Sequence, residues 1–201
     1  VNGVDQGLYG NVEHVDKHWL RRHFDGDDGG DLYKGFLGDF TPDRQAFFEP
    51  ETDGAAGDRS DLDAVTAAVA AGDIATLRTL VDVDEYELHW AAEVLLAHMD
   101  GYAGNANNFY VYRRADGRFA FIPWGPDTTF GTFGAPSSLT SSSLPALLIG
   151  DATESAAYRA QLDALLATAW DEDALDAEVD RIVSLLDGDG ALGLAAQAAP
   201  V

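Results

Sequence analysis

Residues 97–131 read AHMDGYAGNANNFYVYRRADGRFAFIPWGPDTTFG, and this stretch decides how the rest of the chain is interpreted. It predicts that an apolar helix ends near Asp100 and is followed by a polar, asparagine-rich loop. Two strands are expected next, at 109–113 and 119–124, and a second loop then opens with Asp127. The stretch therefore predicts two acidic loops that are held side by side.

The spacing within the first loop is typical of a phosphotransferase. His98, Asp100 and Asn105 have the H-x-D-x-x-x-x-N spacing of a kinase catalytic loop. Asp127 lies beyond the strand pair, where a metal-binding carboxylate is expected, and phosphoryl transfer uses carboxylates and an amide in this way. A plainer interpretation is that Asp100 ends a helix and the asparagines make Asx-turns before a strand. Spacing alone leaves both interpretations open.

A family resemblance adds to this pattern. The run 107–131 resembles a segment of the spore coat protein H (CotH) kinase-like family that contains paired asparagines and a P-W-D-x-D-x-t-F-G motif. Residues 1–35 resemble that family's vNG and GlY stretch, while 81–102 and 158–170 resemble its helix before the catalytic loop and a late helix. The resemblance implies an α+β, atypical protein-kinase-like fold, mostly the helical C-terminal lobe with short strands and hairpins.

The resemblance also implies an activity and its residues. A CotH-like kinase would move the γ-phosphoryl group of ATP to a Ser or Thr hydroxyl of a protein substrate. Asp100 would then accept or orient the hydroxyl proton, Asn105 would hold a magnesium ion, and Asp127 would bridge the metal to the phosphates. Asn108 is a second candidate for the amide ligand, since the family's paired asparagines fall at Asn107 and Asn108. The implied cofactors are ATP and Mg2+.

Two residues outside the central stretch are also candidates for the nucleotide site. In the kinase-like frame Glu13 orients a lysine or contacts the nucleotide, and the alternative is a polar residue at a strand end. Lys34 is one of two lysines in the chain and is a candidate phosphate contact, or else a solvated cation at the end of a strand.

The chain departs from the family pattern in two ways. Gly125 stands where the motif has its first Asp, so that only Asp127 remains and weaker metal binding is expected. The family's Arg-Gly-Asn segment and its phosphate-contacting Lys are expected before Val1. We therefore interpret residues 1–201 as a single domain fragment whose N-terminal part is missing. The Gly- and Ala-rich residues 188–201 are expected to form a frayed tail.

Charge is the most unusual bulk property, with 35 Asp and Glu against 12 Lys and Arg and a net charge of −23. Such a surface repels nucleic acid and anionic membranes, so neither is expected as a partner. The sequence contains no apolar run of about 18 residues, so no membrane span is predicted. Acidic residues spread along the chain, together with few lysines, resemble the solvated surface of a protein from a salt-loving organism. The sequence does not predict the cellular location of the protein, because any targeting segment is expected upstream of this chain. A secreted or cell-surface location is compatible with it.

Other classes of function stay open beside the kinase. A non-catalytic scaffold or surface interaction domain on the same fold would bind nucleotide weakly and tolerate Asp100→Asn. A hydrolase that uses Asp100 and Asp127 as a carboxylate pair is the third alternative, although no aromatic platform for a substrate stands near them.

The remaining elements follow from periodicity and capping signals. A capping box is expected at 60–63, the helix to Met99 is expected to bury Leu88, and Phe47 is expected to anchor a loop at 36–59. Trp124 and Phe130 are expected to pack the second acidic loop. Helices are predicted at 16–24, 60–71, 74–80, 83–99, 151–170 and 173–186, a strand at 32–34, and a further strand or hairpin at 8–12.

Overall fold

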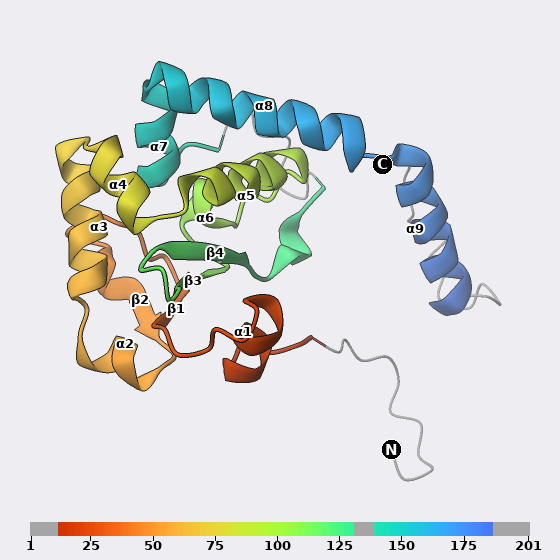
Figure 1. The fold of residues 1–201 in the computed structure, drawn as a ribbon. Helices are drawn as coiled ribbons and strands as arrows, with labels where there is room; N and C mark the ends of the chain where they lie inside the picture. The colour runs from red at the N-terminus through yellow and green to blue at the C-terminus, as the bar shows by residue number, and fades with distance from the viewer. Residues whose placement is uncertain (1–11, 131–138, 187–201) are drawn as a thin grey trace, which may run out of the picture.

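The computed structural model of the chain describes residues 12–130 and 139–186, which form a small antiparallel sheet with helices around it (Figure 1). The sheet has the strand order β2-β1-β3-β4, so β3 and β1 are its inner strands. The fold is α+β, as predicted. The strands are β1 (Leu32–Gly35), β2 (Phe48–Pro50), β3 (Phe109–Arg113) and β4 (Phe119–Pro123).

Strand β3 separates two hydrophobic clusters, because successive side chains of a strand point to opposite faces. Phe109 and Val111 belong to the larger cluster, which α5 (Val83–Leu95) contributes to. Tyr110 belongs to the smaller cluster on the other face, with α1 (Lys17–His23). Both faces of the sheet are thus covered, which holds β3 and the loops at its ends in place.

Helix α8 (Ala152–Thr168) packs along α5 on the side of α5 away from the sheet (Figure 1). The rings of Trp90 and Tyr158 stack there with their centroids 3.7 Å apart. No helix in the described part of the chain has the length and apolar character of a membrane span. The other helices are α2 (Asp53–Gly57), α3 (Ser60–Ala71), α4 (Ile74–Leu80), α6 (Tyr102–Asn105), α7 (Ser143–Gly150) and α9 (Glu172–Leu186), with 3-10 turns η1 (Gln45–Phe47) and η2 (Pro126–Thr128).

Helix α5 ends at Leu95, four residues before the predicted end at Met99. Ala97 adopts a left-handed conformation with φ 52°, and the N–H of His98 donates to the carbonyl of Glu93 at 2.8 Å. These contacts close the helix in a Schellman motif, which usually carries glycine at this position and is therefore hard to read from an alanine. The early end lets the chain turn before it reaches Asp100.

The prediction of burial along α5 was wrong at one position. Leu88 is 41% exposed, whereas the buried positions of the helix include the carboxylates Glu87 and Glu93. Apolar periodicity cannot find a buried carboxylate, because its burial depends on partners that other elements supply.

The loop predicted at 36–59 contains β2, η1 and α2 instead. Phe47 is 49% exposed and does not anchor it, whereas Phe40 and Phe48 are buried. The capping box at the start of α3 is also absent, since the N–H of Ser60 is bound at 2.9 Å by the Asp58 carboxylate. Phe130 is exposed as well, at 56%. The tail predicted at 188–201, and residues 8–11 of the strand or hairpin predicted at 8–12, lie outside the described residues.

Candidate functional site

The carboxylate of Asp100 accepts hydrogen bonds from the amides of three asparagines. Asn105 donates to Oδ1 at 2.7 Å and Asn108 donates to Oδ2 at 2.8 Å. Asn107 Nδ2 lies 3.3 Å from both oxygens. The structure thus brings together three of the predicted site residues, and the Asp100 side chain is fixed from both of its oxygens.

The backbone between these residues is folded tightly. Helix α6 is a single turn, and it is followed by Ala106 and Asn108, which are both in the left-handed region at φ 53° and 51°. Asn adopts this conformation more readily than most residues, because its short polar side chain can bond locally. The turn places Asn105 and Asn108 at different oxygens of the same carboxylate.

The second loop is attached to the first at both ends. The N–H of Trp124, just after β4, donates to the carbonyl of Asn108 at 3.0 Å, and the N–H of Phe130 donates to the carbonyl of Leu96 at 2.7 Å. Gly125 lies directly against Asn108, and a Cβ built on it would be 3.0 Å from Cγ of that asparagine. The position at which the family motif carries its first Asp is therefore beside the Asp100 cluster.

A pocket of about 400 Å³ opens between the two loops. Asp100 and Asn105 line it from the first loop, and Thr128 lines it from the second. Asp127, next to Thr128, is exposed and makes no hydrogen bond or ion pair with any described residue. The remaining lining residues are Met99 and Gly104.

The available ligands are oxygens, which suit magnesium. Because Asn105 and Asn108 donate through Nδ2 to Asp100, their amide oxygens remain as acceptors, and Asp127 adds a carboxylate. The residues at 12–130 and 139–186 contain no group of three or more His, Cys, Asp or Glu that could hold a metal. Magnesium commonly binds one or two carboxylates and completes its shell with water and phosphates. This donor set therefore fits magnesium that arrives with a nucleotide better than a metal held by protein alone.

The structure does not bring Glu13 and Lys34 into this pocket. Glu13 forms an ion pair with Arg22 of α1. The ammonium group of Lys34 lies 6.0 Å from the ring centroid of Tyr110, on the face of the sheet that α1 covers. Their role at a nucleotide remains a prediction.

Several contributors to the site carry no signal in the sequence. Thr128 and Met99 line the pocket from positions that the two motifs leave variable. Only glycine fits at position 104, since a Cβ there would overlap the backbone carbonyl of Met99. Such a requirement shows itself only after the chain has folded.

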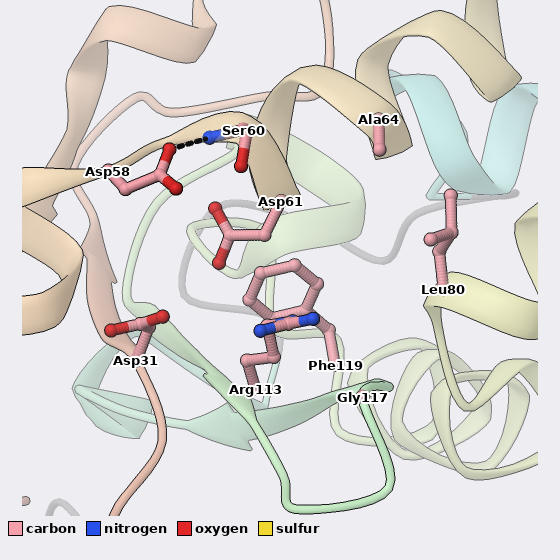
Figure 2. Close-up of a pocket in the computed structure, with 9 residues that line it drawn as sticks. All are labelled: Asp31, Asp58, Ser60, Asp61, Ala64, Leu80, Arg113, Gly117 and Phe119. Carbon is pink, nitrogen blue, oxygen red and sulfur yellow. Dashed lines mark hydrogen bonds between the residues drawn. The ribbon is translucent and has the colours of Figure 1, made fainter.

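A second cavity, of about 200 Å³, lies on another part of the molecule (Figure 2). Asp31, Asp61 and Arg113 are among its lining residues, and none of the predicted site residues is. Asp61 accepts hydrogen bonds from the hydroxyl of Tyr33 at 3.0 and 3.2 Å, and burial raises the pKa of its carboxyl. Asp58, a further lining residue, accepts from the N–H of Ser60 at 2.9 Å, so two of the carboxylates in this cavity already have local partners. The cavity does not resemble a phosphoryl-transfer site.

Comparison with known families gives one match. A model of the family described as CotH kinase protein matches residues 1–187. Among curated proteins, none matches the chain. The matched range includes both loops, the pocket between them and every residue that the sequence predicts for the site.

Proposed function

This chain belongs to the CotH kinase family, and on that premise we propose that the pocket beside Asp100 transfers the γ-phosphoryl group of ATP to a Ser or Thr hydroxyl of a protein. The observation that carries the proposal is the carboxylate of Asp100, fixed by three amides at the edge of a pocket large enough for reacting groups. A positioned carboxylate is what hydroxyl activation requires.

In this proposal the hydroxyl oxygen forms a bond to the γ-phosphorus while the bond from that phosphorus to the bridging oxygen breaks and ADP leaves. The hydroxyl proton passes to Asp100. The amides of Asn105 and Asn108 restrict the carboxylate to one orientation, so that it is already aligned when the hydroxyl arrives.

Magnesium, when bound with ATP, neutralises charge on the phosphates. Asp127 and the amide oxygens of Asn105 and Asn108 are the residues that we propose to hold it. Because Gly125 supplies no carboxylate, we expect a lower metal affinity than a site with both acids would have. We also propose that Glu13 and Lys34 contact the nucleotide. Residues 1–201 would all belong to one kinase-like domain.

The direct test is calorimetric titration of Mg-ATP into the protein at high salt, beside Asp127→Ala. We expect binding that requires magnesium and that weakens in the variant. Asp43→Ala is a matched control, because Asp43 is also an exposed carboxylate but belongs to neither of the two loops. Equal binding by all three proteins would remove Asp127 from the metal site.

A non-catalytic scaffold is the second candidate function, and the missing carboxylate at Gly125 favours it. The two candidates differ for Asp100→Asn, which replaces an acceptor by an amide that opposes the three asparagine donors. A kinase should lose phosphoryl transfer by about 10²–10⁴-fold, the usual contribution of a positioned base. A scaffold should bind its partner equally well with this substitution, and its well-folded wild-type protein should bind Mg-ATP only weakly.

A further inference from the structure

Helix α6 has no side-chain cap of its own. It is four residues long, too short to be stable alone, and its N-cap residue Gly101 contributes no side-chain hydrogen bond. Its first N–H groups are instead bound by Glu93, a residue of α5. Oε1 of Glu93 accepts from the N–H of Tyr102 and Oε2 accepts from the N–H of Ala103, both at 2.8 Å.

Glu93 is 4% exposed, so its carboxylate has been removed almost fully from water. Burial of a carboxylate is unfavourable unless the charge is bound by donors. Besides the two N–H groups, its Oε1 lies 3.2 Å from Nε2 of His89, one turn earlier on the same helix. All of these partners lie on α5 or α6, so the charge fastens α6 to α5 specifically.

The position of α6 determines the geometry at Asp100. The helix occupies the chain between Asp100 and Asn105, and the 2.7 Å bond between these residues spans it. A shift of α6 therefore separates Asn105 from Asp100. The hydroxyl of Tyr102 is held independently by Asp39 at 2.8 Å, so α6 stays attached at its side when the cap is lost.

From this geometry we propose that Glu93 is a positioning residue, which fixes the orientation of the Asp100 carboxylate by capping α6 from α5. The inference rests on the proposed function for its catalytic consequence, but not for its structural one. Gly101 belongs to the same device, because a Cβ at this position would overlap Oε1 of Glu93. A residue without a Cβ is needed at position 101, because the carboxylate of Glu93 lies against the backbone there.

The test compares Glu93→Gln with Glu87→Gln. Both residues are buried on α5, and both substitutions replace a carboxyl group by an amide of the same size, but Glu87 faces Glu154 of α8 and does not touch α6. In Glu93→Gln an NH2 group replaces one of the two acceptor oxygens, so that one backbone N–H of α6 loses its acceptor. We expect hydrogen exchange at Tyr102 and Ala103 to accelerate about tenfold or more, as for loss of a charge-assisted bond. Glu87→Gln should leave these two amides unchanged.

A second readout separates positioning from general destabilisation. The side-chain NH2 resonances of Asn105 report its bond to Asp100, and they should shift in Glu93→Gln while staying fixed in Glu87→Gln. Phosphoryl transfer, measured where both variants are folded, should fall about tenfold or more only in Glu93→Gln. If Glu93→Gln does not fold, Gly101→Ala displaces the same carboxylate and keeps its charge, and it should give the same local changes.

The outcomes distinguish this inference from the proposed function. Unchanged exchange at Tyr102 and Ala103, or an unchanged Asn105 signal, would overturn the positioning role even if the wild-type protein transfers phosphate. The expected exchange and resonance changes in a protein that binds no Mg-ATP would support the role of Glu93 and reject the kinase. Changes in both spectra with full retention of transfer would also overturn the inference.

Discussion

Gly125 lies beside Asn108 in a left-handed conformation, with φ 54°. Asp is among the few residues with a side chain that adopt this conformation readily. We therefore expect Gly125→Asp to fold and to add a carboxylate next to the amides at Asp100. Mg-ATP should bind about tenfold more tightly, the lower end of the range known for changes around a metal ligand. Titration calorimetry at several magnesium concentrations measures this.

A matched control for Gly125→Asp is Gly72→Asp. Gly72 also has a positive φ, 64°, and a Cβ there meets open space at the end of α3, away from the pocket. Its variant should leave nucleotide binding unchanged. Tighter binding in both variants would mean that the effect comes from charge or backbone changes in general, and the metal site would then lie elsewhere.

Residue spacing picked out three residues that the structure brings together, but it could not pick out the contacts that support them. Asp100, Asn105 and Asn108 are close in sequence, so their meeting depends on one local turn and is readable from a motif. Glu93 binds backbone N–H groups, which every residue but proline has, so its partners leave no mark in the sequence. Lys34 has a side chain suited to phosphate, but the strand register points it at Tyr110.

At the scale of elements, the contact between α5 and α8 contains a buried pair of glutamates. The carboxyl of Glu87 is buried against Glu154, which Arg78 of α4 binds through two N–H groups at 3.1 and 2.5 Å. Burial, together with the hydrogen bond and negative charge of Glu154, raises the pKa of Glu87 to about 8; Arg78 opposes the rise and Asp84 adds to it. Glu87 is therefore protonated in the folded protein at neutral pH.

The sign of the pH effect follows from this shift. The unfolded chain releases the Glu87 proton near the ordinary glutamate pKa of 4.5, whereas the folded protein keeps it until about pH 8. The folded state thus binds more protons between these values, and the stability falls as the pH rises through them, by an amount on the order of a few kcal/mol. Above about pH 8 this contribution becomes constant.

Glu87→Gln should remove this dependence, because an amide donates to Glu154 at any pH. Urea unfolding measures this. At about pH 5 the wild-type protein and Glu87→Gln should have similar free energies of unfolding, and at about pH 9 the variant should be the more stable of the two. Asp163→Asn, which removes an exposed carboxylate from α8, should keep the wild-type difference. A variant that is less stable than wild type at the higher pH would contradict the assignment.

At the scale of elements, periodicity located the long helices because their apolar faces meet the core. It missed β2, which has three residues and owes its conformation to pairing with β1, where Lys34 lies opposite Glu49. A strand this short has too few alternations to be recognised. The end of α5 was missed for the different reason that alanine, in place of glycine, occupies the left-handed position.

The whole molecule carries a net charge of −23, and its self-repulsion opposes the compact state. Salt screens this repulsion, so the melting temperature should rise by roughly 5–10 °C between about 0.1 M and about 2 M KCl. Differential scanning calorimetry measures the change. Sucrose, which acts by exclusion without screening, should raise it less at the same osmolality. An unchanged or lower melting temperature in KCl would show that repulsion between like charges does not limit stability.

The site is assembled from one continuous part of the chain, from Glu93 of α5 to the backbone bond between Phe130 and Leu96. Contacts between residues that are near in sequence close small loops, which costs little chain entropy and is fast. The sheet, in contrast, needs β1 to pair with the distant β3. During refolding we expect the Asp100 loop to form in the same kinetic phase as the β3–β4 hairpin, before the sheet is complete.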